Sequence, residues 1–234
     1  MLNAIMAGKK RGTGLQGEAF SPEEAEGAED VITATVFERL AYLPDEQFCA
    51  VMHDLLGESF GPLQEIQYWP SWKSRDNTKV EPDLVLHDGR RTVVVEAKRL
   101  DHRDQQSPAQ LAKELLAGWH GNQLEGGCIL LALGGLGDPI NRARLRLEEA
   151  LQQTLADHQA SPYRLVCQSW QGLFQILQQH IRPDGPTSCQ RLFDDIASCY
   201  AWHDLRTHDR RWLKDLRDRQ IASHPDAFAP WRMK

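Results

Sequence analysis

The segment Val80–Leu100, with the sequence VEPDLVLHDGRRTVVVEAKRL, restricts the fold more than any other part of the chain. An Asp88-Gly89 pair separates two largely apolar runs, and both residue types tolerate the positive φ angles of a tight turn. The pattern therefore predicts a β-hairpin with a two-residue turn at Asp88-Gly89, in which His87 pairs with Arg90.

The predicted hairpin carries charged side chains at one end. In the expected register Asp83 lies opposite Val94, and Glu96 lies one diagonal step away, at about 7–8 Å between backbones. Side chains alternate along a strand, so Glu96 shares a face with Lys98, whereas Ala97 points to the other face. Two carboxylates at this spacing can converge on one divalent cation. We therefore expect a site on this face, with Glu96 pointing away from the helix-packed side of the sheet.

Periodicity outside the hairpin predicts strands and helices in alternation. Strands are expected at 64–69, 127–133 and 163–168, a polar loop at 73–79, and helices at 28–43, 45–56, 107–119, 139–158, 170–181, 189–205 and 210–221. A hairpin followed by strands that need helical crossovers gives an α/β fold with a mixed central β-sheet flanked by helices. The predicted divisions are a flexible N-terminal tail (1–27), an α/β core (28–182) and a helical C-terminal extension (183–234).

Composition limits the classes of protein to which the chain can belong. With 234 residues, 41% of them hydrophobic, it can bury one sizeable core. Its five cysteines show no Cys-x-x-Cys spacing, which argues against structural zinc and a disulfide framework. No apolar run approaches the roughly 18–20 residues that span a bilayer, so we expect a soluble, cytoplasmic protein. The net charge of −6 does not by itself indicate a nucleic-acid binder.

One acid of the first predicted helix stands out on a helical wheel. Glu29 lies on the apolar stripe with Val36 and Leu40, whereas Glu38 lies on the opposite side. An inward carboxylate is unfavourable unless it is paired or binds a metal. In a first helical turn, however, the helix dipole favours an acid without burial, so the wheel leaves both interpretations of Glu29 open. We expect Glu38 to be a solvated surface residue.

Two motifs resemble a known superfamily. Pro82-Asp83, followed at the end of the next strand by Glu96-Ala97-Lys98, resembles the signature of the PD-(D/E)xK (restriction endonuclease-like) nucleases. The order of predicted elements over residues 28–133 is similar as well. Residues 29–33, EDVIT, resemble the acidic helix that precedes the sheet in bacterial defence-type members. The resemblance implies a restriction endonuclease-like core and favours a place for Glu29 in the site.

The resemblance also implies a reaction, namely metal-assisted hydrolysis of phosphodiester bonds, of DNA rather than RNA. Asp83 and Glu96 would hold Mg²⁺, for which Mn²⁺ could substitute, with the backbone carbonyl of Ala97 as a further ligand and Glu29 in support. Lys98 would orient or deprotonate the attacking water. Defence-type relatives further imply anti-phage or restriction activity in a prokaryote, with a regulatory or defence-system partner protein.

Alternatives remain for several residues and for the function. Gln110 lies where related nucleases carry a polar residue that reaches toward the site, but a place in the helix cap begun by Ser107 explains it equally well. Arg99 and Arg103 could meet the substrate backbone or be ordinary surface charges. The alternative functions are a catalytically silent module that binds nucleic acid or protein, and a structure-specific DNA repair nuclease.

Overall fold

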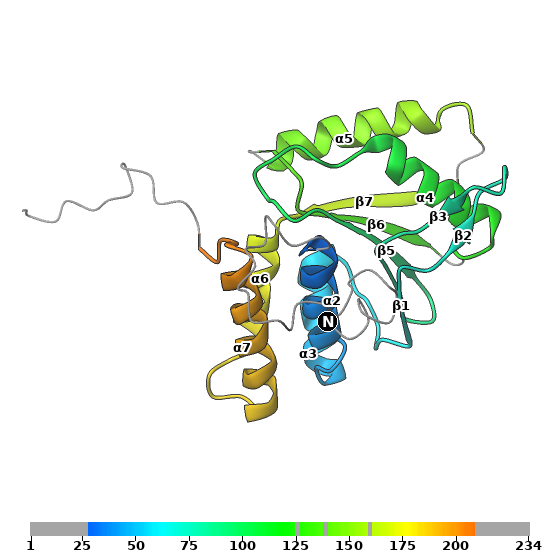
Figure 1. Ribbon diagram of the computed structural model, residues 1–234. Coiled ribbons are helices and arrows are strands. Elements are labelled where there is room, and N and C mark those ends of the chain that lie inside the picture. The colour runs from blue at the N-terminus through cyan, green and yellow to red at the C-terminus, as the bar shows by residue number, and fades with distance from the viewer. Residues whose placement is uncertain (1–27, 125–126, 138–139, 159–160, 209–234) are drawn as a thin grey trace, which may run out of the picture.

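The computed structural model describes residues 28–124, 127–137, 140–158 and 161–208 (Figure 1). At its centre is a five-stranded sheet in the order β1-β4-β5-β6-β7, antiparallel from β1 to β5 and parallel from β5 to β7. The strands span Glu65–Tyr68 (β1), Leu84–His87 (β4), Thr92–Ala97 (β5), Cys128–Leu133 (β6) and Tyr163–Gln168 (β7). The tail predicted at 1–27 and the helix predicted at 210–221 lie outside the described residues.

Helices cover both faces of the sheet (Figure 1). One layer contains α2 (Ala28–Leu40), α3 (Asp45–Leu56), α6 (Trp170–His180) and α7 (Thr187–Trp202), and the other contains α4 (Pro108–His120) and α5 (Ile140–Leu155). The prediction of an α/β fold with a mixed central sheet flanked by helices is confirmed. None of the helices in the described ranges is long and apolar enough to cross a membrane.

The sequence of β5, TVVVEA, explains its central place in the sheet. All six residues are buried, as expected for a β-branched run that is covered on both faces. Val93 and Val95 pack into the core with α2 and α3, whereas Val94 packs into the core with α4 and α5. The same alternation directs Glu96 toward α4 and Ala97 toward the opposite layer.

The loop between β4 and β5 differs from the predicted turn. It has four residues, Asp88–Arg91, because His87 pairs with Thr92 rather than with Arg90. The Oδ1 atom of Asp88 accepts hydrogen bonds from the N–H groups of Arg90 and Arg91 at 2.8 and 2.7 Å, which closes this wider loop. The predicted two-residue turn at Asp88-Gly89 is therefore wrong.

The wider loop shifts the register by two residues. Leu84 pairs with Val95, and the next pair along this register brings Asp83 directly opposite Glu96 instead of opposite Val94. Because side chains repeat every two residues along a strand, a shift of two leaves every side chain on its predicted face. The predicted register is therefore wrong, but the shared face of the charged residues does not depend on it.

Two segments differ from the predicted organisation: one predicted loop contains strands, and one predicted extension packs against the core. Part of the polar loop predicted at 73–79 forms a ribbon of two short strands, β2 (Trp72–Lys73) and β3 (Lys79–Val80), which Trp72 attaches to the α4 side of the core. The predicted C-terminal extension includes α7, which completes the core that α2, α3 and α6 form with the sheet. There the buried Tyr200 hydroxyl donates to the Trp170 carbonyl at 2.8 Å.

The expectation for Glu38 is wrong. Its side chain is only 10% exposed and pairs with Arg39 at 3.2 Å. Helix α2 lies between the sheet and α7, and its residues from Val31 to Phe37 are buried on every side. A helical wheel assumes one apolar stripe and one wet face, and that assumption fails for a helix enclosed in this way.

The carboxyl ends of β5, β6 and β7 share one edge of the sheet, where a Gly134-Gly135 turn packs against the chain that leaves β5. Lys98 N–H donates to the Leu133 carbonyl at 2.8 Å, and Gly135 N–H donates to the Leu100 carbonyl at 2.8 Å. Gly134 has a φ of +67°, and a Cβ atom there would clash with the Lys98 carbonyl oxygen. The turn therefore requires glycine in order to hold the backbone of Lys98.

We predict that Gly134→Ala lowers the free energy of unfolding by about 2–4 kcal/mol, because it combines a positive φ with a backbone clash. Gly137→Ala is the matched control, since a Cβ there would meet the side chains of Arg146 and Asp104 at 3.8 and 3.9 Å. Urea denaturation of both variants measures the difference. Equal stabilities would show that the turn tolerates a side chain.

Candidate functional site

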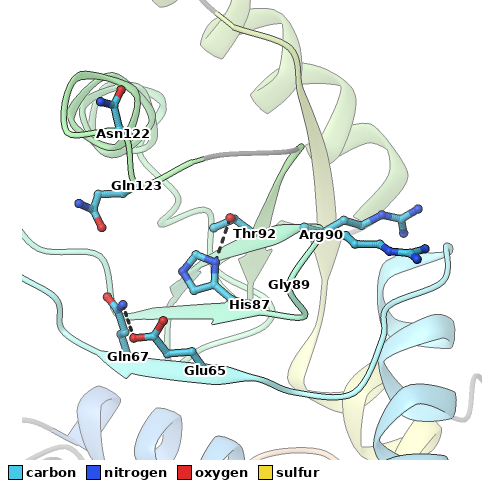
Figure 2. A pocket seen from close by; sticks show the side chains of 9 residues that line it. Glu65, Gln67, His87, Gly89, Arg90, Thr92, Asn122 and Gln123 are labelled. Atoms are coloured by element: carbon cyan, nitrogen blue, oxygen red, sulfur yellow. Dashed lines mark hydrogen bonds between the residues drawn. The ribbon is translucent and has the colours of Figure 1, made fainter.

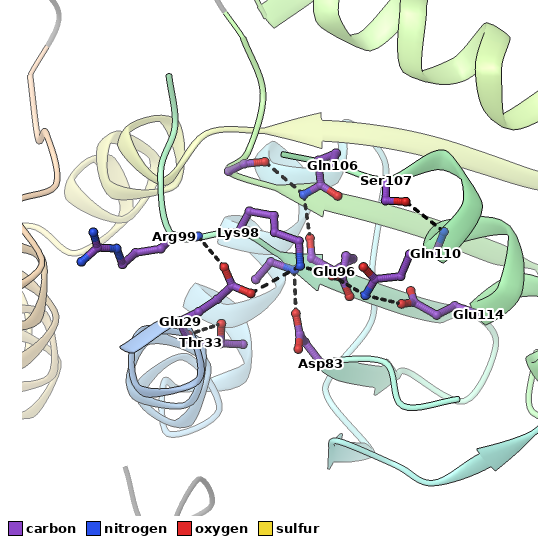
Figure 3. A network of polar contacts seen from close by, with 12 residues as sticks. Glu29, Thr33, Asp83, Glu96, Lys98, Arg99, Gln106, Ser107, Gln110 and Glu114 are labelled. Carbon is purple, nitrogen blue, oxygen red and sulfur yellow. Dashed lines mark hydrogen bonds and ion pairs between the residues drawn. The ribbon is translucent and has the colours of Figure 1, made fainter. Parts of the chain in front are cut away.

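Charged and polar side chains from both helical layers meet at the carboxyl edge of β5 (Figure 3). Three come from the β4–β5 hairpin and the residues that flank it, one from the first turn of α2, and two from α4. We call this group the carboxylate–lysine cluster, and its members are Asp83, Glu96, Lys98, Glu29, Gln110 and Glu114.

Lys98 lies at the centre of the cluster. Its Nζ atom is 2.5 Å from Glu96 Oε1 and 3.3 Å from Glu29 Oε1. Burial alone would lower the pKa of Lys98, but the charge and hydrogen bond of Glu96, with the charges of Glu29 and Asp83, raise it above its ordinary value. Lys98 is therefore a firmly protonated ammonium that neutralises part of the surrounding negative charge.

Glu29 reaches the cluster from the start of α2. Its second carboxylate oxygen, Oε2, accepts the backbone N–H of Arg99 at 3.0 Å. Its side chain is thus held between the ammonium of Lys98 and the main chain that follows it. Of the two interpretations that the helical wheel left open, the structure supports the paired carboxylate.

Asp83 is fixed across the hairpin by a direct bond. Its Oδ2 atom accepts the backbone N–H of Ala97 at 2.9 Å. Burial and the negative charge of Glu96 raise the pKa of the Asp83 carboxyl well above its usual range, against the lowering effects of the Ala97 N–H and of Lys98. A rigid backbone contact therefore holds this carboxyl in a place where its ionised form is unfavourable.

Glu96 is buried beneath α4, with 1% of its surface exposed. The expectation that it would point away from the helix-packed side of the sheet is wrong, because helices cover both sides. Its Oε1 atom accepts from Lys98 and from Gln110 Nε2, the latter at 2.7 Å. Access to the cluster is therefore from the sheet edge, where the side chains of Lys98 and Glu29 are 18% and 36% exposed.

Glu114 belongs to the cluster although the sequence analysis did not select it. It is 1% exposed, and its Oε1 atom accepts from Gln110 Nε2 at 3.2 Å. Burial, followed by the charge of the adjoining Glu96 carboxyl and a hydrogen bond to it, raises the pKa of Glu114 well above its usual range. A helical wheel over α4 would have found it, because it lies beside Leu111 and Leu115 on the buried face.

The residues predicted to contact substrate differ in their placement. The cap bond is made by the backbone N–H of Gln110, which donates to the Ser107 hydroxyl oxygen at 3.3 Å, whereas its side chain reaches Glu96 and Glu114, so the structure supports the reach toward the site. The Arg99 side chain points away from the cluster (Figure 3). Arg103 lies exposed in the following loop. Contact of these three residues with a substrate stays a prediction.

The donor set of the cluster suits a divalent cation such as Mg²⁺, which prefers carboxylate and carbonyl oxygens. Within the described ranges no group of three or more His, Cys, Asp or Glu side chains stands in an arrangement ready to hold a metal ion. However, apart from the contact between these two carboxyls, the buried Oε2 atoms of Glu96 and Glu114 receive no hydrogen bond from any residue that the structure describes. Buried carboxylate oxygens without donors are groups that a cation would stabilise.

Two cavities lie at opposite ends of the β4–β5 hairpin. One of about 610 Å³ is formed in part by Leu100, Asp101 and His102, which closely follow Lys98 in the chain. The other, of about 430 Å³, adjoins the Asp88–Arg91 loop and is lined by polar side chains that include His87 (Figure 2). Neither cavity is lined by a residue of the cluster, but the first lies nearer to it along the chain, because Leu100 follows Lys98 by two residues.

The fold and the cluster define an α/β protein with a buried carboxylate–lysine site at the carboxyl edge of a mixed sheet. The chain is 38% identical to the uncharacterized protein PM0110 of Pasteurella multocida (strain Pm70) over 226 residues, which cover 94% of this chain and 87% of the relative. The chain therefore belongs to the same family as PM0110. Neither a family model nor a solved structure matches the chain.

We predict that Asp83→Asn raises the free energy of unfolding at pH 7 by about 1–3 kcal/mol in EDTA, because it removes a buried charge and keeps an acceptor for the Ala97 N–H. The folded-state pKa of Asp83 lies above its unfolded value of about 3.9, so the wild type loses stability as pH rises from that value toward the folded-state pKa. The gain should therefore shrink toward pH 4.

Urea denaturation between pH 4 and pH 8 measures this difference. The exposed Asp184, which pairs with Arg182, gives the control Asp184→Asn, for which no such pH dependence is expected. A lower stability of Asp83→Asn at pH 7 would contradict the cost assigned to its charge.

Proposed function

We propose that the chain is a Mg²⁺-dependent nuclease that hydrolyses phosphodiester bonds, with DNA as the expected substrate, on a restriction endonuclease-like core. The observation that carries the proposal is the meeting of Asp83, Glu96 and Lys98 at one end of a β-hairpin, with Glu29 on the same ammonium. Two carboxylates and a lysine gathered at a strand edge are the groups that metal-assisted phosphoryl chemistry uses.

In this proposal Asp83, Glu96 and the Ala97 carbonyl hold the Mg²⁺, with Glu29 in support; Mn²⁺ has the same ligand preferences. When bound, the cation would polarise a phosphate oxygen and lower the pKa of a coordinated water. The protein contributes carboxylates in fixed orientations. Asp83 is fixed by the hydrogen bond that it accepts from the Ala97 N–H, and Glu96 by the hydrogen bond that it accepts from the Gln110 side chain. Both bonds fix the direction of a carboxylate before any substrate arrives.

Lys98 has the role of a cation in this proposal. Before a cation binds, the surrounding carboxylates raise its pKa, so Lys98 is an ammonium in the metal-free site. An ammonium at this edge would attract the phosphate group and offset the charge that develops on its oxygens during hydrolysis.

The surroundings of the cluster are consistent with an extended anionic substrate. Arg99 and Arg103 lie on the loop that follows Lys98, and Arg206 lines the cavity beside that loop together with Asp101 and Asp204. Cations along an exposed loop attract a phosphate backbone without reading its sequence. The proposal includes a cytoplasmic, prokaryotic defence or restriction setting, with a regulatory partner protein.

We predict that purified protein cuts DNA with Mg²⁺ or Mn²⁺ and not in EDTA. Asp83→Asn and Lys98→Met should each lower the cutting rate by about 10²–10³-fold, because each removes one of the charged groups assigned to the reaction. Gel assays on plasmid, single-stranded DNA and RNA measure the rates and show which nucleic acid is cut.

Matched controls use exposed residues of the same types. Asp184→Asn and Lys113→Met, the latter on the exposed side of α4, should cut like the wild type. Nucleic-acid binding without cutting under any metal would favour the catalytically silent module. Cutting that persists in Asp83→Asn and Lys98→Met would disprove the assigned site.

A further prediction concerns Arg99 and Arg103. If each contacts one phosphate, replacing it with alanine should reduce the slope of log affinity against log salt by about 0.9 for duplex DNA. Fluorescence anisotropy in EDTA measures binding without cutting. The control is Arg182→Ala, which replaces an exposed arginine just after the end of α6. If the Arg99 and Arg103 variants show the same slope as this control, the two arginines are ordinary surface charges.

A further inference from the structure

Glu114 is the residue in the core whose presence packing explains least. It lies on the buried face of α4 among Leu111, Ala112 and Leu115, and its carboxyl contacts the carboxyl of Glu96. No lysine, arginine or histidine in the described part of the chain forms a salt bridge with it. An apolar residue would fill the position without placing a second acid against Glu96.

The contact that Glu114 does make is with Gln110, one helical turn before it. A single amide nitrogen, Gln110 Nε2, donates to Glu96 Oε1 at 2.7 Å and to Glu114 Oε1 at 3.2 Å. An amide has two N–H donors on one side and a carbonyl on the other. Because both partners are carboxylates, only the orientation with the N–H groups toward them is favourable. Glu114 therefore fixes which way the amide of Gln110 points.

The fixed amide in turn fixes Glu96. Figure 3 shows Glu96 between Gln110 and Glu114 on one side and Lys98 and Glu29 on the other. Oε1 of Glu96 receives donors from both sides, so the carboxylate is held in one orientation. Without a defined Gln110, the flexible side chain of Lys98 would be the one remaining donor to this oxygen among the residues that the structure describes.

We infer that Glu114 is a positioning residue for the cation site: through the amide of Gln110 it holds Glu96 in the orientation that binds a divalent cation. This inference rests on the proposed function, because it assumes that Glu96 is a metal ligand. Groups that orient the ligands of a metal site change metal affinity or activity by about 10–100-fold when they are replaced.

The test measures Mn²⁺ affinity by calorimetry without nucleic acid. We expect Glu114→Gln to weaken binding by about 10–100-fold, because a glutamine can turn either its N–H or its carbonyl toward Gln110 and the fixed orientation is lost. Gln110→Ala should weaken binding similarly. The double variant should be no weaker than Gln110→Ala alone, since Glu114 acts through Gln110. Glu149→Gln, an exposed glutamate of α5, is the control and should bind like the wild type.

A second measurement separates positioning from a structural role. In EDTA, Glu114→Gln should melt at the same temperature as the wild type or about 2 °C or more above it, because it removes a buried acid from beside Glu96. A melting temperature that falls together with metal affinity would overturn the inference. So would effects of Glu114→Gln and Gln110→Ala that add in the double variant.

The failure of this inference differs from the failure of the proposed function. If Asp83→Asn abolishes Mn²⁺ binding and Glu114→Gln leaves it unchanged, the cation site is supported and the positioning role of Glu114 is disproved. If Asp83→Asn binds Mn²⁺ as tightly as the wild type, or if the wild type binds no Mn²⁺, the proposed cation site is disproved, and the role of Glu114 is disproved with it.

Discussion

The structure at the strand edge depends on one ammonium group surrounded by carboxyl groups. Lys98 pairs directly with Glu96 and Glu29, and the charge of Asp83 also acts on it, while Glu114 contacts Glu96 from behind. Buried like charges repel strongly because the protein interior screens them less than water does. The raised pKa values of Asp83 and Glu114 express this repulsion, so one lysine does not balance the acids that the fold brings together.

Rigid elements hold these groups together against their repulsion. Each acid is tied to a donor that cannot move far: Asp83 to the Ala97 N–H, Glu29 to the Arg99 N–H, and Glu96 to Gln110 on α4. Below them, β5 is a valine run with both faces buried, and the Gly134-Gly135 turn holds the backbone just beyond it. Apolar packing on the two sides of the sheet thus stabilises a polar arrangement that is unfavourable on its own.

The features that could be predicted from the sequence are those that the repeat of side chains along a strand or helix determines. The period of two along a strand placed Asp83, Glu96 and Lys98 together even though the predicted turn was wrong by two residues, because an even shift preserves the face. It could not give the loop length, since the side chain of Asp88 closes a four-residue loop as readily as the dipeptide suggests a two-residue one. The mixed sheet and its flanking helices followed from the alternation of strand and helix patterns in the same way.

The residues that were misjudged or missed have environments that depend on contacts between distant segments of the chain. Glu38 was expected on the surface, but α7 encloses the helix on which it lies, and that contact joins segments far apart in the chain. Glu114 lies on the buried stripe of α4 with Leu111 and Leu115, so its inward direction was open to a helical wheel, but its contact with Glu96 depends on how α4 packs on β5. A helical wheel shows a stripe but not which neighbours cover the helix, and those neighbours decided the environment of both residues.

The unfavourable electrostatic energy of the cluster bears on the choice between a catalyst and a catalytically silent binding module. A module that only binds could replace Asp83, Glu96 or Glu114 with neutral residues of similar shape and would become more stable, since buried acids without enough cations destabilise a fold. The chain instead gathers all of them in one cluster, with two carboxyl oxygens that receive no donor from any other residue that the structure describes. Such an arrangement is unfavourable for a scaffold but suits a site that gains its remaining positive charge from a bound cation, and this is the physical reason for preferring the nuclease.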